Sequence, residues 1–229
     1  MSRSLMVLLV GAGALWWWSN RLAAAAPMTP PLYLLMWLVM MAAMMLPALE
    51  PVIRLYARMS ERSAAPLPVF LSGYFAAWML VALPAYGAWR LLADPLMNGE
   101  AWAGRLAGAV LLATAAYQVS PAKQACLRAC RSPLTLFMSA KGSLADPRLA
   151  VRLGVRHGLW CLGCCWALMA ALTAVGVMQP LWMIGLATVI YFEKTSRHGD
   201  RLAPLLALPF AGLGLTLLIH PAVLTAITQ

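Results

Sequence analysis

One uncharged stretch decides the fold of this chain: PLYLLMWLVMMAAMMLPAL, which runs from Pro31 to Leu49. A helix needs roughly 17 to 25 predominantly apolar residues to cross about 30 Å of hydrocarbon, and this stretch falls in that range. A strand of a membrane barrel needs only about 10 residues, which alternate between polar and apolar. The stretch therefore predicts a membrane-spanning helix.

The composition of the whole chain is also that of a membrane protein. Hydrophobic residues make up 63% of the 229 residues and charged residues 10%, whereas soluble domains contain about 25% charged residues. Because lipid offers the backbone no hydrogen bonds, long apolar stretches must be helical. We expect an all-α, polytopic transmembrane helical bundle of about seven spans, forming one integral membrane domain over residues 1–229. The expected spans are Leu5–Trp18, Pro31–Leu49, Val69–Leu92, Ala101–Val119, Gly158–Val177, Leu181–Phe192 and Ala203–Ile219.

The first and sixth of these segments are the shortest. Asn20 and Arg21 end the first one early, and the small residues Ala24 to Ala26 also fit the end of a cleaved signal peptide. Both interpretations leave the topology after Pro27 unchanged. The sixth segment must extend toward Lys194 or cross where the bilayer is thin.

The distribution of basic residues predicts the orientation. With the amino terminus in the cytoplasm, as Arg3 indicates, only Arg21, Arg90 and Arg105 of the 17 Lys and Arg residues fall outside. This asymmetry is typical of the positive-inside rule in a multi-pass protein of the cytoplasmic (inner) membrane. The longest connection, at about residues 120–157, is a basic cytoplasmic loop. The net charge of +10 therefore reflects topology, and we expect no nucleic-acid partner.

All five cysteines fall on the cytoplasmic side of this topology. The cytosol is reducing, so clustered thiols there are more often metal ligands or redox groups than disulfides. Cys126 and Cys130 are four residues apart, and Cys161, Cys164 and Cys165 follow a three-and-four spacing, so each set shares one helix face. The alternative is that these small side chains only fill helix contacts.

Two further residues extend the second thiol face by one helical turn in each direction. His157 lies four residues before Cys161, and Met169 lies four residues after Cys165. The face then offers imidazole, thiol and thioether ligands, and we include both residues in the predicted metal site.

The first apolar stretch adds methionines to the candidate ligands. Met40 and Met44 are four residues apart, as are Met41 and Met45, and both pairs lie toward the cytoplasmic end of the span. Thioether sulfur is a soft, neutral ligand that favours Cu(I) over harder ions. Methionine that merely fills an apolar helix is the alternative.

Two of the seven acidic residues lie at the ends of expected spans, each with a basic residue nearby. Glu50 precedes Arg54 by four residues, the spacing of a helical ion pair. Direct ligation of the metal by Glu50 is the alternative. Glu193 ends the sixth span beside Lys194, where we expect an interfacial charge pair.

Three segments carry a resemblance to a known family. They are MMAAMMLP at residues 40–47, QVSPAKQACLRACRSP at residues 118–133, and GVRHGLWCLGCCWALM at residues 154–169. Their order and sequence resemble a bacterial family of predicted metal-binding integral membrane proteins of unknown function. The resemblance covers nearly the whole chain and implies a metal site built from these segments. Ala129 departs from the pattern, because a histidine is expected there, which makes the site here more purely sulfur.

These patterns favour a soft-metal protein that binds Cu(I) and acts in copper handling, delivery or metalloenzyme assembly. We expect copper as the cargo, with zinc as the alternative metal, and we do not expect an enzyme. Two other interpretations stay open. Cys161 and Cys164 form CLGC, a thioredoxin-like spacing that would suit a membrane thiol-disulfide oxidoreductase. Four thiolates would suit a structural zinc ion.

The expected partners follow from the same hypothesis. They are the lipid bilayer and a copper-receiving protein, and a homo-oligomer that shares the site is also compatible with the sequence. Active pumping is not expected, because the sequence contains no GxxxxGKS/T phosphate-binding loop.

Overall fold

The computed structural model describes residues 3–25, 29–60, 67–140, 146–176 and 180–224. These residues form an all-helical chain without strands, in agreement with the predicted fold class. The helices are α1 (Arg3–Ala25), α2 (Pro30–Ser60), α3 (Leu67–Met97), α4 (Ala101–Gln118), α5 (Pro121–Arg131), α6 (Pro133–Met138), α7 (Pro147–Gly176), α8 (Pro180–Thr195) and α9 (Gly199–Ile219).

Proline sets many of the helix boundaries. Helices α2, α5, α6, α7 and α8 all begin with proline, whose fixed φ suits the first helical turn and whose missing N–H is not needed there. Prolines also occur inside α2, α3 and α9. Interior prolines are more readily tolerated in membrane helices than in soluble ones.

Four helices are long and apolar enough to cross a membrane: α2, α3, α7 and α9. Among the described residues, α1, α4 and α8 are helical as predicted but do not meet the same criteria of length and composition. Helix α8 has 16 residues, or about 24 Å at 1.5 Å per residue, which is shorter than the roughly 30 Å hydrocarbon core. The seven spans and the cytoplasmic amino terminus stay predictions.

Helix α7 begins 11 residues before the expected span, at Pro147 instead of Gly158. The added turns carry Arg148, Arg152 and Arg156, all exposed and spaced four residues apart. Such an amphipathic extension is helical but not apolar, so apolar length alone did not reveal it. His157 and the thiols after it therefore lie inside a continuous helix. The expected loop at residues 120–157 contains α5, α6 and the beginning of α7.

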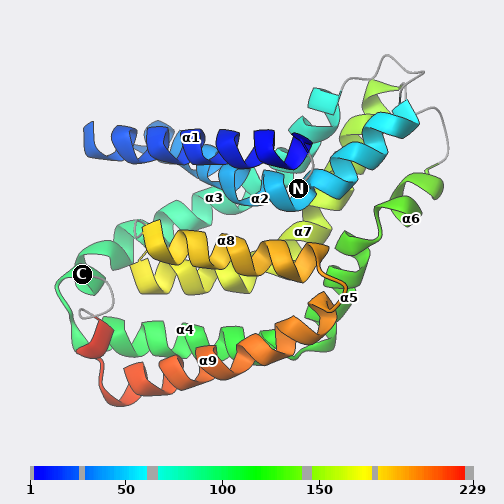
Figure 1. The fold of residues 1–229 in the computed structure, drawn as a ribbon. Helices are drawn as coiled ribbons and strands as arrows, with labels where there is room; N and C mark the ends of the chain where they lie inside the picture. Colours follow the sequence, from blue (N-terminus) through cyan, green and yellow to red (C-terminus); the bar gives the residue numbers. More distant parts are fainter. Residues whose placement is uncertain (1–2, 26–28, 61–66, 141–145, 177–179, 225–229) are drawn as a thin grey trace. The chain divides into compact units, whose positions relative to one another are not determined.

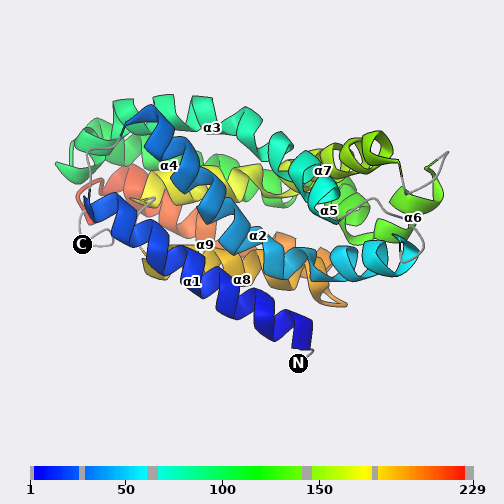
Figure 2. The ribbon, with the colours of Figure 1, turned by 90° about the horizontal axis from the view of Figure 1, so that it is seen from above.

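The chain divides into two compact units, and the division falls within α3, α5 and α7. The first unit comprises the described parts of residues 1–83 and 128–162. In it, α2 packs against α1 and α6 (Figure 1 and Figure 2). Its aromatic core joins Tyr56, Phe70 and Phe137, with ring centroids 4.9 to 6.0 Å apart.

The second unit comprises the described parts of residues 84–127 and 163–229. In it, α9 runs along α4 and also contacts α8 (Figure 1). Gly108 and Gly214 face one another, because a Cβ on Gly108 would lie 2.7 Å from the carbonyl oxygen of Gly214. These two glycines let the backbones of α4 and α9 touch. The apolar core of this unit includes Leu111, Val175 and Leu217.

Candidate metal centre

Two helices carry the thiols, and the sequence explains where each begins. Helix α5 starts at Pro121, and the hydroxyl of the preceding Ser120 accepts a hydrogen bond from the Lys123 N–H at 3.1 Å. Serine in this position caps the first helical turn. Helix α5 then presents Cys126 and Cys130 one turn apart, and α7 presents Cys161, Cys164 and Cys165 near its middle.

Three thiols form a group that could hold a metal ion. The sulfur atoms of Cys130, Cys161 and Cys164 all lie within 4.8 Å of one another, and the three side chains are buried. Thiolates about 2.3 Å from a central ion in a trigonal plane would be about 4.0 Å apart. Small side-chain movements would therefore close the group around an ion.

The other two thiols lie beside this group. The sulfur of Cys165 is 3.3 Å from that of Cys164. Cys126 is half-buried against α7, since a Cβ on Gly163 would lie only 2.7 Å from its sulfur. Burial raises the pKa of the Cys126 thiol, and the positive charge of Lys123 opposes that rise. None of the five cysteines, all of which are among the described residues, forms a disulfide.

Aromatic residues lie beside Cys161. The Tyr74 hydroxyl lies 2.9 Å from the Cys161 sulfur, and both side chains are buried. His157 is also fully buried, and its ring centroid lies 6.0 Å from that of Tyr74 and 6.4 Å from that of Phe70. Sequence reasoning missed Tyr74, because nothing local distinguishes it from other aromatic residues in apolar helices.

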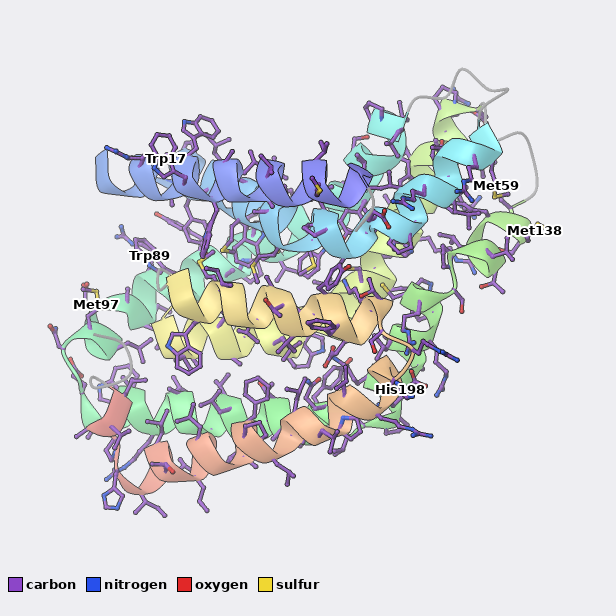
Figure 3. The ribbon with its side chains drawn as sticks, in the orientation of Figure 1. Trp17, Met59, Trp89, Met97, Met138 and His198 are labelled. Atoms are coloured by element: carbon purple, nitrogen blue, oxygen red, sulfur yellow. The ribbon has the colours of Figure 1, made fainter. Side chains whose placement is uncertain are left out.

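The predicted methionine ligands are all buried. Met41 and Met45 are completely inaccessible, and Met40, Met44 and Met169 are nearly so. By contrast, Met97 and Met138 project away from their helices in Figure 3 and are 78% and 72% exposed. It is still a prediction that metal binding involves the buried methionines, His157, Cys126 and Cys165.

Hydrogen bonds to backbone carbonyls fix the thiol-bearing turn of α7. The Tyr117 hydroxyl donates to the carbonyl of Gly163 at 2.7 Å, and the Thr114 hydroxyl donates to that of Ala167 at 3.0 Å. The Lys123 ammonium donates to the carbonyl of Cys164 at 2.7 Å. Helices α4 and α5 thus hold the CLGCC segment in place.

Lys123 also forms a buried ion pair with Glu193, in which the charged atoms are 2.7 Å apart. The sequence had instead predicted Lys123 in a cytoplasmic loop and Glu193 at the membrane interface. Both side chains are buried, and the Gln118 amide donates to the same carboxylate at 3.1 Å. The spacing of residues could have indicated that Lys123 lies near the thiols, because Lys123 is on the face of α5 that carries Cys126 and Cys130. The other predicted pair, Glu50 with Arg54, is confirmed.

The chain matches one known protein family over residues 34–217, and that family, PpoB2, is described as a copper chaperone. The match includes both thiol-bearing helices and the methionine-rich part of α2. It supports the copper aspect of the expected function, while the membrane aspect rests on the apolar helices alone. No curated protein matches the chain significantly, and neither does any solved structure.

Proposed function

Because the chain belongs to the PpoB2 family of copper chaperones, we propose that it binds Cu(I) in a multi-pass membrane bundle and delivers it for metalloenzyme assembly. One observation carries the proposal: three buried thiols from α5 and α7 converge within 4.8 Å. Thiolates are the soft ligands that select Cu(I) or zinc among the common metals.

The number of converging thiols favours copper over zinc. Structural zinc sites almost always use four protein ligands in a tetrahedron, whereas the tight group here has three. Cys165 could supply a fourth sulfur, because it lies 3.3 Å from the sulfur of Cys164. Zinc is therefore the competing metal in the experiment below.

Delivery requires that the ion can leave as well as enter. Thiolate binds Cu(I) tightly, and thioether sulfur is a weaker ligand for the same ion. In the proposed function, the thiols are the holding site, and the buried methionines of α2 are weaker ligands used during transfer. His157 and Met169, which extend the thiol face of α7, are further ligands used during transfer.

The membrane part of the proposal rests on four apolar helices and on the apolar surface that they expose. On α9, Leu205, Leu208 and Ile219 point outward and are at least 60% exposed. An apolar surface of this kind would be unfavourable in water and is suited to lipid. Basic connections favour a cytoplasmic location for the thiols, where they would stay reduced.

Metal titration of the full-length chain in detergent tests this function. With reductant present and a competing chelator, the wild type is expected to bind one Cu(I) per chain and to prefer it to Zn(II). The combined change Cys130→Ser, Cys161→Ser and Cys164→Ser should abolish that binding. Cys126→Ser is the matched single change outside the group and should weaken binding less.

Other outcomes would overturn the proposal. Tight zinc retention without Cu(I) binding would favour a structural zinc site. A chain that binds neither metal but cycles Cys161 and Cys164 between dithiol and disulfide would favour the oxidoreductase interpretation.

A further inference from the structure

A buried pair of opposite charges lies beside the thiol-bearing turn of α7. Lys123 and Glu193 are both inaccessible to solvent, and their charged atoms are 2.7 Å apart. Removing two charges from water is costly, and a well-packed apolar pair of similar volume is often equally stable or more stable. Stability alone therefore does not explain why charges occupy these positions.

Besides its partner Glu193, the lysine contacts the backbone of a thiol-bearing residue. Its ammonium donates to the carbonyl of Cys164 at the same distance, 2.7 Å, at which it meets Glu193. On α5, Lys123 precedes Cys126 by three residues and Cys130 by seven, which places all three on one helix face. The positive charge therefore lies at the backbone of a thiol-bearing turn, and burial shields it from bulk water.

Metal binding changes the charge of the thiol group in a way that depends on the metal. Ligating thiols lose their protons, so three thiolates around Cu(I) carry two net negative charges. The same thiolates around Zn(II) carry only one. A nearby buried cation stabilises the more negative complex more strongly, because buried charges are poorly screened.

We propose that Lys123 is a specificity-determining residue that offsets the negative charge of the Cu(I)-loaded thiol group and so favours Cu(I) over Zn(II). This inference rests on the proposed function, since it takes Cu(I) as the cargo of these thiols. Glu193 balances the lysine while the thiols are protonated and neutral. Gln118, which donates to Glu193 at 3.1 Å, holds the carboxylate in position.

The test compares Cu(I) and Zn(II) affinities of purified variants in detergent, each measured against a competing chelator. Lys123→Met is expected to weaken Cu(I) binding by about tenfold or more and Zn(II) binding less, so the preference for copper falls. Glu193→Gln keeps the lysine but removes its counter-charge, so the preference for copper should rise. Arg128→Met is the matched control, because Arg128 lies on the same helix but is exposed, and it should leave the preference unchanged.

Opposite shifts in the two variants separate an electrostatic role from a structural one. A purely structural ion pair would lower the affinity for both metals, in the same proportion, in Lys123→Met and in Glu193→Gln, and that result would overturn the inference. Lys123→Met alone could unfold, because it leaves the Glu193 charge buried without its partner. The double change Lys123→Met with Glu193→Gln removes both charges, and it should fold and still lose the preference for copper.

The result for the wild type distinguishes failure of this inference from failure of the proposed function. A wild type that binds no Cu(I) would refute both. A wild type that prefers Cu(I), together with variants that keep the same preference, would refute only the role of Lys123.

Discussion

At the scale of single residues, two glycines on α7 determine how closely α3 can approach. A Cβ on Gly158 would lie 2.7 Å from the carbonyl oxygen of Tyr74, and a Cβ on Gly154 would clash with the carbonyl of Phe70. Both contacts are with backbone, which cannot rotate away. This approach brings the Tyr74 hydroxyl to 2.9 Å from the Cys161 sulfur, so the glycines help to position a neighbour of the metal centre.

Gly158→Ala is therefore expected to destabilise the protein, by about 1–3 kcal/mol, because the added methyl group overpacks a helix contact. The thermal unfolding midpoint of the detergent-purified variant measures this effect. Gly212→Ala is the control, since nothing lies within 4 Å of a Cβ there, and replacing a helical glycine should stabilise by about 0.5–1 kcal/mol. Equal midpoints for the two variants would show that α3 and α7 are not in backbone contact.

At the scale of helices, the sequence could not decide whether the methionines of α2 are core residues or metal ligands. Met40, Met41, Met44 and Met45 are buried, as either core residues or metal ligands would be. The i, i+4 spacing predicts a shared face but not what that face meets, because that depends on which helices pack around α2. Sulfur chemistry, not burial, is what can distinguish the two roles.

Changing Met40, Met41, Met44 and Met45 together to Leu removes four sulfurs while nearly preserving volume and helix propensity. The fold should survive, and Cu(I) binding or delivery should weaken without being abolished, whereas Zn(II) binding should be unchanged. Met97→Leu with Met138→Leu removes exposed sulfurs and is the control. Unchanged copper binding and delivery in the fourfold variant would show that these methionines only fill the core.

The thiol-bearing helices show what could and could not be predicted from the sequence. Spacing placed Cys126 with Cys130 and Cys161 with Cys164 on shared faces, since helical periodicity is local. Convergence of Cys130 with Cys161 and Cys164 is a tertiary contact, and here it was expected only from the chemistry of a shared metal. The Lys123–Glu193 pair joins residues 70 positions apart, whereas the sequence had placed Lys123 in a cytoplasmic loop and Glu193 in an interfacial pair with Lys194.

At the scale of the whole molecule, the number of membrane crossings decides which compartment the thiols of α5 face. Helices α2, α3, α7 and α9 meet the criteria for a span, whereas the distribution of Lys and Arg predicts that α1, α4 and α8 cross as well. If α4 did not cross, the segment after it would lie on the same side as the turn between α3 and α4. The two topologies therefore differ at the connection that follows α6.

Reporter fusions at three described positions resolve this difference. The seven-span topology predicts that an export-dependent reporter is active after Asn98, in the turn that precedes α4, and that a cytoplasmic reporter is active after His198, in the turn that precedes α9. If α2 runs toward the cytoplasm in both topologies, they agree on these two positions, which therefore serve as controls for orientation. A fusion after Ala140, just beyond α6, decides the issue. Cytoplasmic activity there means that α4 crosses and that the α5 thiols lie in a reducing compartment, where they can hold Cu(I) as thiolates. Export-dependent activity there would mean that α4 does not cross, would expose the α5 thiols to oxidation, and would make disulfide chemistry the better account of the cysteines.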